Sequence, residues 1–146
     1  MRTYRLYASE NPKAAVACTQ VHLCRIPRAL VDQLAQGRDA LPRELMLRWQ
    51  RALDAAEAWV SDLSTGPARR RLLHLLQRLA GHAGPGGTIW LPRREEIGAM
   101  LDMTIETASR LVSTLRREGV LTLAPGRSAV LDRAALRKAL LAEGAA

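Results

Sequence analysis

Three polar side chains, Glu106, Ser109 and Arg110, could read DNA bases from one side of a single helix. The apolar residues of the stretch 103–120 recur at helical spacing, which predicts a buried stripe made of Ile105, Ala108, Leu111, Val112 and Leu115. The three polar residues fall on the opposite side and begin in the first turn. Arginine can donate two hydrogen bonds to guanine, glutamate accepts one from the cytosine amino group, and serine can do either. Because an exposed Glu–Arg pair four residues apart is also common on ordinary helices, the interpretation depends on the neighbouring elements.

A short helix is expected just before this one, over residues 93–101. Its inward side would consist of Ile97, Met100 and Leu101. Gly98 stands where a side chain would obstruct the following helix. After a tight connection at residues 102–103, Thr104 is a good N-cap for the second helix, which we expect over residues 104–118. The two helices together predict a helix-turn-helix.

The elements around this pair complete a winged helix-turn-helix. Upstream, Pro67 begins a helix expected to end near residue 80, with an apolar stripe of Leu72, Leu73, Leu75, Leu76 and Leu79. A loop over residues 81–87 and a short strand over residues 88–91 follow. Downstream, residues 119–132 predict a β-hairpin, and Asp132 can cap a last helix. The expected fold is therefore mainly helical with a small β part.

A long helix is expected over residues 42–64, since no glycine or further proline interrupts it before Gly66. Apolar residues recur along it at spacings of three and four, and they form a seam of Leu45, Trp49, Ala52, Ala56, Trp59 and Leu63. Met46, Leu53 and Val60 widen this seam. The alternative is a helix that packs on its own core, but so small a protein has little core for a helix of about six turns. We therefore expect the seam to join two copies of the chain.

The N-terminal part predicts a β-rich run over residues 16–26 and a short helix over residues 28–34. Cys18, His22 and Cys24 share one side of that strand, but same-face neighbours stand about 7 Å apart and no fourth ligand is near in the sequence. We expect no metal and no cofactor. Nor does the sequence contain a catalytic triad, a phosphate-binding loop or paired carboxylates of the kind enzymes use, so no enzymatic activity is expected.

Charge and composition are consistent with a polyanionic partner. The chain has 22 Lys and Arg residues against 14 Asp and Glu in 146 residues, a formal net charge of +8. Such an excess favours nucleic acid or an anionic membrane, although lysine is scarce and an Arg-rich genome would have the same effect. No segment has the length and hydropathy of a membrane span, so we expect a cytoplasmic protein that does not act at a membrane.

Three motifs resemble the DNA-binding domain of the Crp/Fnr superfamily of bacterial transcription regulators. They are EEIGAML at residues 95–101, T-x-E-T-x-S-R-L at residues 104–111, and LRREGVL at residues 115–121. The Glu-x-x-Ser-Arg pattern is similar to that of the Fnr branch, whose members favour half-sites with a TTGA-like core. The resemblance implies that Glu106, Ser109 and Arg110 are the base readers. It also implies that Thr104 and Thr107 lie close to phosphates.

The resemblance extends upstream and implies a domain organisation. Residues 1–40 look like a remnant of the family's sensory β-roll, residues 41–64 like its dimerisation helix, and residues 65–146 like its winged helix-turn-helix domain. Only about a dozen residues precede the strand that is similar to the end of the β-roll, and the residue pairs of a cyclic-nucleotide pocket are missing. An Fnr-type cluster needs four cysteines, and this chain has two. Asp102 replaces the family's usual turn glycine, which it should tolerate, and Arg93 replaces a capping Ser or Thr, which weakens that cap.

The sequence therefore predicts a homodimeric regulator that binds double-stranded DNA at a palindromic operator. Further phosphate contacts are expected from Ser113, Arg116 and Arg127. The arginines at residues 69–71 are weaker candidates for the same role. RNA polymerase is a further candidate partner. Two alternatives stay open: a sensor-less dimerisation module that modulates full-length relatives, and a truncated piece of a sensor-regulator. Target genes, the direction of regulation and any signal are not readable from the sequence.

Overall fold

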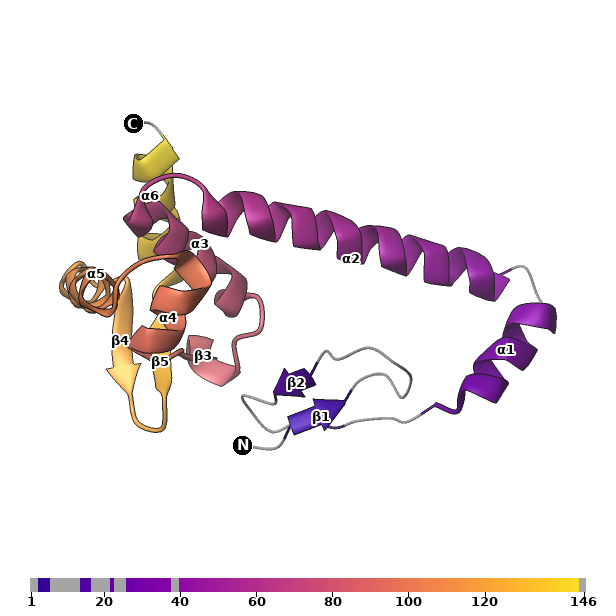
Figure 1. Ribbon diagram of the computed structural model, residues 1–146. Helices are drawn as coiled ribbons and strands as arrows, with labels where there is room; N and C mark the ends of the chain where they lie inside the picture. The colour runs from indigo at the N-terminus through magenta and orange to yellow at the C-terminus, as the bar shows by residue number, and fades with distance from the viewer. Residues whose placement is uncertain (1–2, 6–13, 17–21, 23–25, 38–39, 145–146) are drawn as a thin grey trace. The chain divides into compact units, whose positions relative to one another are not determined.

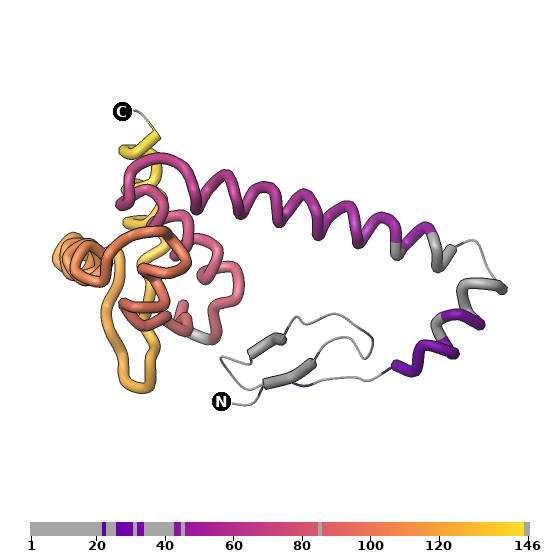
Figure 2. The backbone as a smooth tube through the Cα atoms, viewed as in Figure 1, coloured from indigo at the N-terminus to yellow at the C-terminus, as the bar shows by residue number. Residues whose placement is uncertain are grey.

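The computed structural model describes residues 3–5, 14–16, 22, 26–37 and 40–144 (Figure 1). The chain divides into two units, residues 1–50 and residues 51–146. Figure 2 traces the backbone through both units. Within the described residues, no helix combines the length and the apolar character needed to cross a membrane.

The first unit contains a small hairpin and a helix. Strand β1 (Thr3–Arg5) pairs antiparallel with β2 (Ala14–Val16), and α1 spans Arg28–Gly37. The helix expected over residues 28–34 is thus confirmed and is three residues longer. Of the strand expected over residues 16–26, His22 and Ile26 are described beyond β2, and neither lies in a strand. Cys18 and Cys24 lie outside the described residues.

The long helix expected over residues 42–64 is confirmed as α2, a helix of 25 residues that spans Ala40–Ser64. It ends where Gly66 adopts a positive φ of 83°, a conformation that favours glycine. Pro67 follows with extended backbone and stands at the N-cap of the next helix, one position before the first-turn place expected for it. The proline thus still marks the start of the new helix, from just outside it.

The second unit is a winged helix-turn-helix, as the sequence predicts. Helix α3 (Ala68–Ala80) is followed by the 3-10 turn η1 (Pro85–Gly87) and by β3 (Thr88–Trp90). Helices α4 (Arg94–Leu101) and α5 (Ile105–Arg117) come next, then the hairpin β4 (Leu121–Ala124) and β5 (Ser128–Leu131), and finally α6 (Arg133–Gly144). The sheet is antiparallel in the order β3-β5-β4, and Figure 1 shows it beside α4 and α5. The Asp132 carboxylate accepts from the backbone N–H groups of Ala134 and Ala135, so the expected cap of α6 is confirmed.

Leucine and other aliphatic residues build the core of this unit. Four of the five leucines of the α3 stripe, Leu72, Leu73, Leu75 and Leu76, are at most 1% exposed, and the fifth, Leu79, packs against them half-buried. Ile97 and Leu101 of α4 join them, together with Leu121 and Leu131 of the hairpin. Each such side chain contributes roughly 1.5–3 kcal/mol when it is fully buried. The core therefore fixes α3, α4, α5 and the hairpin as one body.

Leu63 belongs to this core and not to the exposed seam of α2. Its side chain is 2% exposed and lies in the same cluster as the leucines of α3. The expectation that Leu63 lies at a dimer interface is therefore corrected. Spacing puts Leu63 in line with the seam, but the last turn of α2 comes directly before the reversal into α3, and its apolar side chain is covered there.

Candidate nucleic-acid interface

The turn between α4 and α5 is held by backbone geometry. Asp102 ends α4 in the left-handed conformation, with φ 48° and ψ 60°, and the N–H of Met103 donates to the carbonyl of Gly98 at 3.0 Å. A Cβ added to Gly98 would stand 2.7 Å from the Met103 carbonyl oxygen, closer than real contacts allow. The expected reason for a glycine here is thus confirmed. Asp102 adopts the left-handed geometry that it was expected to tolerate.

An arginine from α3 supports the same turn, which sequence reasoning missed. Arg71 donates to the carbonyl of Asp102 at 3.1 Å and to that of Gly66 at 3.3 Å. Arg69 pairs with Glu118 and Glu143, and these bonds raise its pKa although burial alone would lower it. Arg70 lies 3.5 Å from the His74 ring nitrogen, so all three arginines considered for phosphate contact have partners within the domain.

Thr104 caps α5. Its hydroxyl accepts from the N–H of Thr107 at 3.2 Å and lies 3.2 Å from the Thr107 hydroxyl. Arg93, at the N-cap of α4, has no side-chain cap of that kind, as its residue type implies. There, Glu96 accepts from the Arg93 N–H at 2.7 Å, which is the return half of a capping box. The start of α5 is thus capped by Thr104, and the start of α4 is stabilised by the bond from the N-cap backbone to Glu96.

The buried side of α5 is narrower than its spacing predicts. Ala108, Val112 and Leu115 are at most 1% exposed, and Leu111 is half-buried, but Ile105 is 46% exposed. Met100 of α4 is 44% exposed, so its expected inward position is also corrected. At 100° per residue both side chains lie at the margin of their stripes, next to the turn where the two backbones are closest. Periodicity shows the apolar side but not where the neighbouring helix stops covering it.

The opposite side of α5 carries the expected base readers. Glu106, Arg110 and Ser113 are exposed, and Ser109 is half-buried. The pKa of Glu106 is lowered by its own backbone N–H and then by the Thr104 hydroxyl, against a small effect of burial, and Arg110 adds the least. Glu106 is therefore a carboxylate at neutral pH and can only accept hydrogen bonds.

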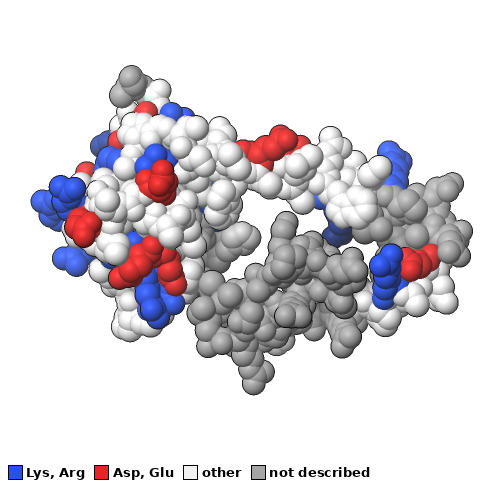
Figure 3. Space-filling model, viewed as in Figure 1, with Lys and Arg blue, Asp and Glu red and all other residues white. Residues whose placement is uncertain are grey.

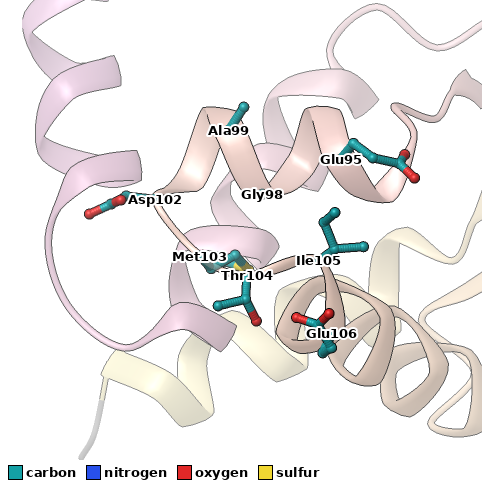
Figure 4. A pocket seen from close by; sticks show the side chains of 8 residues that line it. All are labelled: Glu95, Gly98, Ala99, Asp102, Met103, Thr104, Ile105 and Glu106. Carbon is teal, nitrogen blue, oxygen red and sulfur yellow. The ribbon is translucent and has the colours of Figure 1, made fainter.

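A hollow opens beside Glu106, between α4 and the start of α5 (Figure 4). Its lining is Glu95, Gly98, Ala99, Asp102, Met103, Thr104, Ile105 and Glu106. In Figure 4 the carboxylates of Glu95 and Asp102 stand at opposite ends of α4. The described residues hold no group of three His, Cys, Asp or Glu side chains that could bind a metal, and this hollow is no exception.

Basic side chains flank the helix. Arg116 and Arg117 are exposed in its last turn, where the helix dipole favours positive charge. Figure 3 shows Arg and Lys side chains interspersed with Asp and Glu over the second unit. The excess of positive charge is thus spread over this face and does not form a single uninterrupted patch.

Arg127, expected at the groove, lies in the hairpin turn with a positive φ of 61°. Its guanidinium forms an ion pair with Glu96 and lies over the Trp90 ring, 4.9 Å from the centroid. The structure does not test its expected phosphate contact, with which these internal contacts would compete.

The seam of α2 is largely uncovered. Trp49 is 67% exposed, Trp59 is 44% exposed, and Ala52 and Ala56 are exposed; the side chain of Leu45 lies outside the described set. The three widening residues Met46, Leu53 and Val60 are 60–65% exposed. Trp59 is also stacked under Arg78, whose guanidinium carbon is 5.3 Å from the ring centroid and which bonds Asp62 at 2.7 Å. The seam therefore presents an apolar strip, anchored at one end to α3.

Comparisons with known proteins agree with this architecture. The family model described as a Crp-like helix-turn-helix domain matches residues 70–139. The chain is 34% identical over 124 residues to a probable transcriptional activator of Rhizobium leguminosarum bv. viciae, covering 82% of this chain and 52% of that protein. It is 31% identical over 125 residues to the transcriptional activator protein FnrL of Cereibacter sphaeroides, covering 79% and 50%.

A solved structure shares the fold. FixK2 from Bradyrhizobium japonicum superposes with a TM-score of 0.67 at 28% identity, covering 77% of this chain and 58% of that one. The chain spans about half the length of the curated relatives it matches. These likenesses support a relationship of this chain to the Crp/Fnr superfamily. Residues 70–139 match the model of a Crp-like helix-turn-helix domain.

Proposed function

We propose that this chain is a sequence-specific DNA-binding transcription regulator of Crp/Fnr type that binds a palindromic operator as a dimer. One observation carries the proposal: α5 is locked on one side by Ala108, Val112 and Leu115 and presents Glu106 and Arg110 from the first turns of its other side. A recognition helix reads base edges with its N-terminal residues. The similarity to proteins named as transcriptional activators supports the same function.

The base readers are Glu106, Ser109 and Arg110. Arg110 donates to the O6 and N7 acceptors of guanine, the ionised Glu106 accepts from a cytosine amino group, and Ser109 serves either base. Their pattern resembles that of Fnr-type regulators, which makes a TTGA-like half-site the first one to test.

Contacts to phosphates position the helix without specifying sequence. The exposed residue Thr104 and the half-buried Thr107 stand at the N-terminus of α5, where backbone N–H groups also favour an anion. Ser113 and Arg116 are exposed farther along the helix. We assign these four residues to the DNA backbone.

Dimerisation occurs through the seam of α2 at Trp49, Ala52, Ala56 and Trp59, together with Leu45. These residues share one side of the helix, and alanines at its middle would let a second helix approach closely. The two α5 helices would then enter successive major grooves about 34 Å apart. The protein would act in the cytoplasm, with RNA polymerase as a candidate partner.

Replacement of Arg110 by alanine tests the base-reading role. Arg110→Ala should weaken binding to a palindromic duplex with TTGA-like half-sites by about 1–3 kcal/mol. It should weaken binding to random duplex only slightly. Arg137→Ala, an exposed arginine of α6, is the matched control and should affect neither strongly. Fluorescence anisotropy with both duplexes measures the difference. An equal loss on the two duplexes would show that Arg110 contacts only the backbone.

The exposed seam would serve a dimerisation module equally well, one that pairs with full-length relatives. The same titration separates the two functions. Operator binding by the pure homodimer supports the regulator, and a homodimer that binds no duplex supports the module.

A further inference from the structure

We propose that Glu96 and Arg127 are a positioning pair that sets the place of the wing beside α5, and that Arg127 is not a phosphate contact. The inference rests on the proposed function, because it assigns the wing's role in operator binding. It replaces the most direct interpretation of an arginine at a wing tip, which is that it reaches out to DNA.

The Glu96 carboxylate joins two segments that are 31 residues apart. It accepts from the Arg93 N–H at 2.7 Å, at the start of α4, and forms an ion pair with the Arg127 guanidinium in the hairpin turn. Because α4 packs against α5 through the turn at Gly98, this pair connects the tip of the wing to the recognition helix through a single short helix.

The strand β3 holds Arg127 from a second side. The Trp90 ring lies under the guanidinium, 4.9 Å from its carbon to the ring centroid, and the Leu91 N–H donates to the Arg127 carbonyl at 2.8 Å. Both the side chain and the backbone of Arg127 are thus fixed by residues outside the hairpin.

Burial argues against a free guanidinium. The Arg127 side chain is 29% exposed, its Nε is buried without a hydrogen-bond partner, and the Glu96 side chain is 35% exposed. To reach a phosphate, Arg127 would have to leave a carboxylate and an aromatic face together. Arg116, in contrast, is exposed in the last turn of α5, and we assign it to a phosphate.

The variant Glu96→Gln should change operator binding in opposite directions under the two roles of Arg127. Glutamine keeps an oxygen that can accept from the Arg93 N–H but removes the charge that holds Arg127. If the pair positions the wing, Glu96→Gln and Arg127→Ala both weaken operator binding, by about three- to thirtyfold, and the double variant is no weaker than the worse single variant. If Arg127 instead contacts phosphate, Glu96→Gln strengthens binding, since it frees a cation and removes a negative charge.

Salt dependence provides a second readout that mere loss of folded protein would not change. The slope of log K against log salt is negative; its magnitude should be unchanged in Arg127→Ala and should decrease by about 0.9 per half-site in Arg116→Ala, the control for a phosphate contact. Thermal unfolding of each variant identifies a temperature at which all are folded. A less negative slope in Arg127→Ala, or binding by both variants equal to that of the original chain, would overturn the proposal.

Amide exchange tests the pair without DNA. Glu96→Gln and Arg127→Ala should each speed exchange of the Leu91 N–H and of the hairpin amides relative to those of α3. Unchanged exchange would overturn the positioning role. If the original chain binds no duplex, the proposed function fails, and exchange still decides whether Glu96 and Arg127 hold the wing.

Discussion

Helices α2 and α3 are consecutive in the chain, but the apolar side chains of α3 are buried and most of those of α2 are exposed. In α3, Leu72, Leu73, Leu75 and Leu76 are at most 1% exposed within one domain. In α2, Trp49 and Leu53 are 67% and 60% exposed, although their spacing is just as helical. The change comes at Leu63, where the side chain of α2 enters the core that α3 completes.

The same helical spacing of apolar residues can therefore serve a core within the chain or a surface that contacts another molecule. Apolar residues at helical spacing require a partner surface, but they do not say whether that surface belongs to the same chain. Large exposed apolar strips on a folded protein mark interaction sites. The core of α3–α6 is filled by its own residues, whereas the seam of α2 is exposed and is the surface that we propose for dimerisation.

The largest effect is expected in the core. Leu76→Ala removes a side chain with 0% exposure and should lower the free energy of unfolding by about 2–5 kcal/mol, through lost burial and a residual cavity. Leu141→Ala, at a leucine that is 70% exposed, is the control and should change it by less than about 0.5 kcal/mol. Urea unfolding measures both. Similar losses at the two leucines would contradict the description of α3 as part of a self-sufficient core.

Substitution in the seam of α2 should change the oligomeric state of the protein. Ala56→Asp puts a charge on the side of α2 that carries the apolar strip, and it should convert the dimer to a monomer in analytical ultracentrifugation. Ala58→Asp makes the same substitution two residues away, on the far side of the helix, and should leave the mass unchanged. If Ala56→Asp remains a dimer, the interface lies elsewhere.

A smaller effect is expected at the N-cap of α5. Thr104→Ala removes the hydroxyl that accepts from the Thr107 N–H and should cost about 1 kcal/mol of folding free energy. Ser113→Ala, an exposed mid-helix serine, is the control and should cost little. Chemical denaturation followed by circular dichroism checks the pair. Equal stability of the two variants would show that the core alone fixes the start of α5.

Local chemistry made much of the fold predictable. Gly98 allows the close approach at the turn and Thr104 caps α5, and the structure shows both of these roles as the sequence predicts. The helix boundaries are also close to those expected, because Gly66 and Pro67 mark the end of one helix and the start of the next. These features depend on neighbours within a few residues.

The features that the sequence did not predict depend on distant contacts. Leu63 is buried and Ile105 is exposed, the reverse of what their spacing predicts, because periodicity does not report where a covering element begins or ends. The partner of Arg127 is Glu96, 31 residues away, and no local pattern pairs them. Of the candidate site, spacing predicts which side of α5 faces outward, but the contacts that fix its surroundings appear only in three dimensions.

Selection of bound sequences from a random duplex pool tests the central claim most directly. The purified full chain should enrich a palindrome with two half-sites whose centres lie about one helical turn, roughly 34 Å, apart. The half-sites should have a TTGA-like core, and Arg110→Ala should lose that preference. Retention of duplex without any enriched sequence, or no retention at physiological salt, would contradict sequence-specific operator binding.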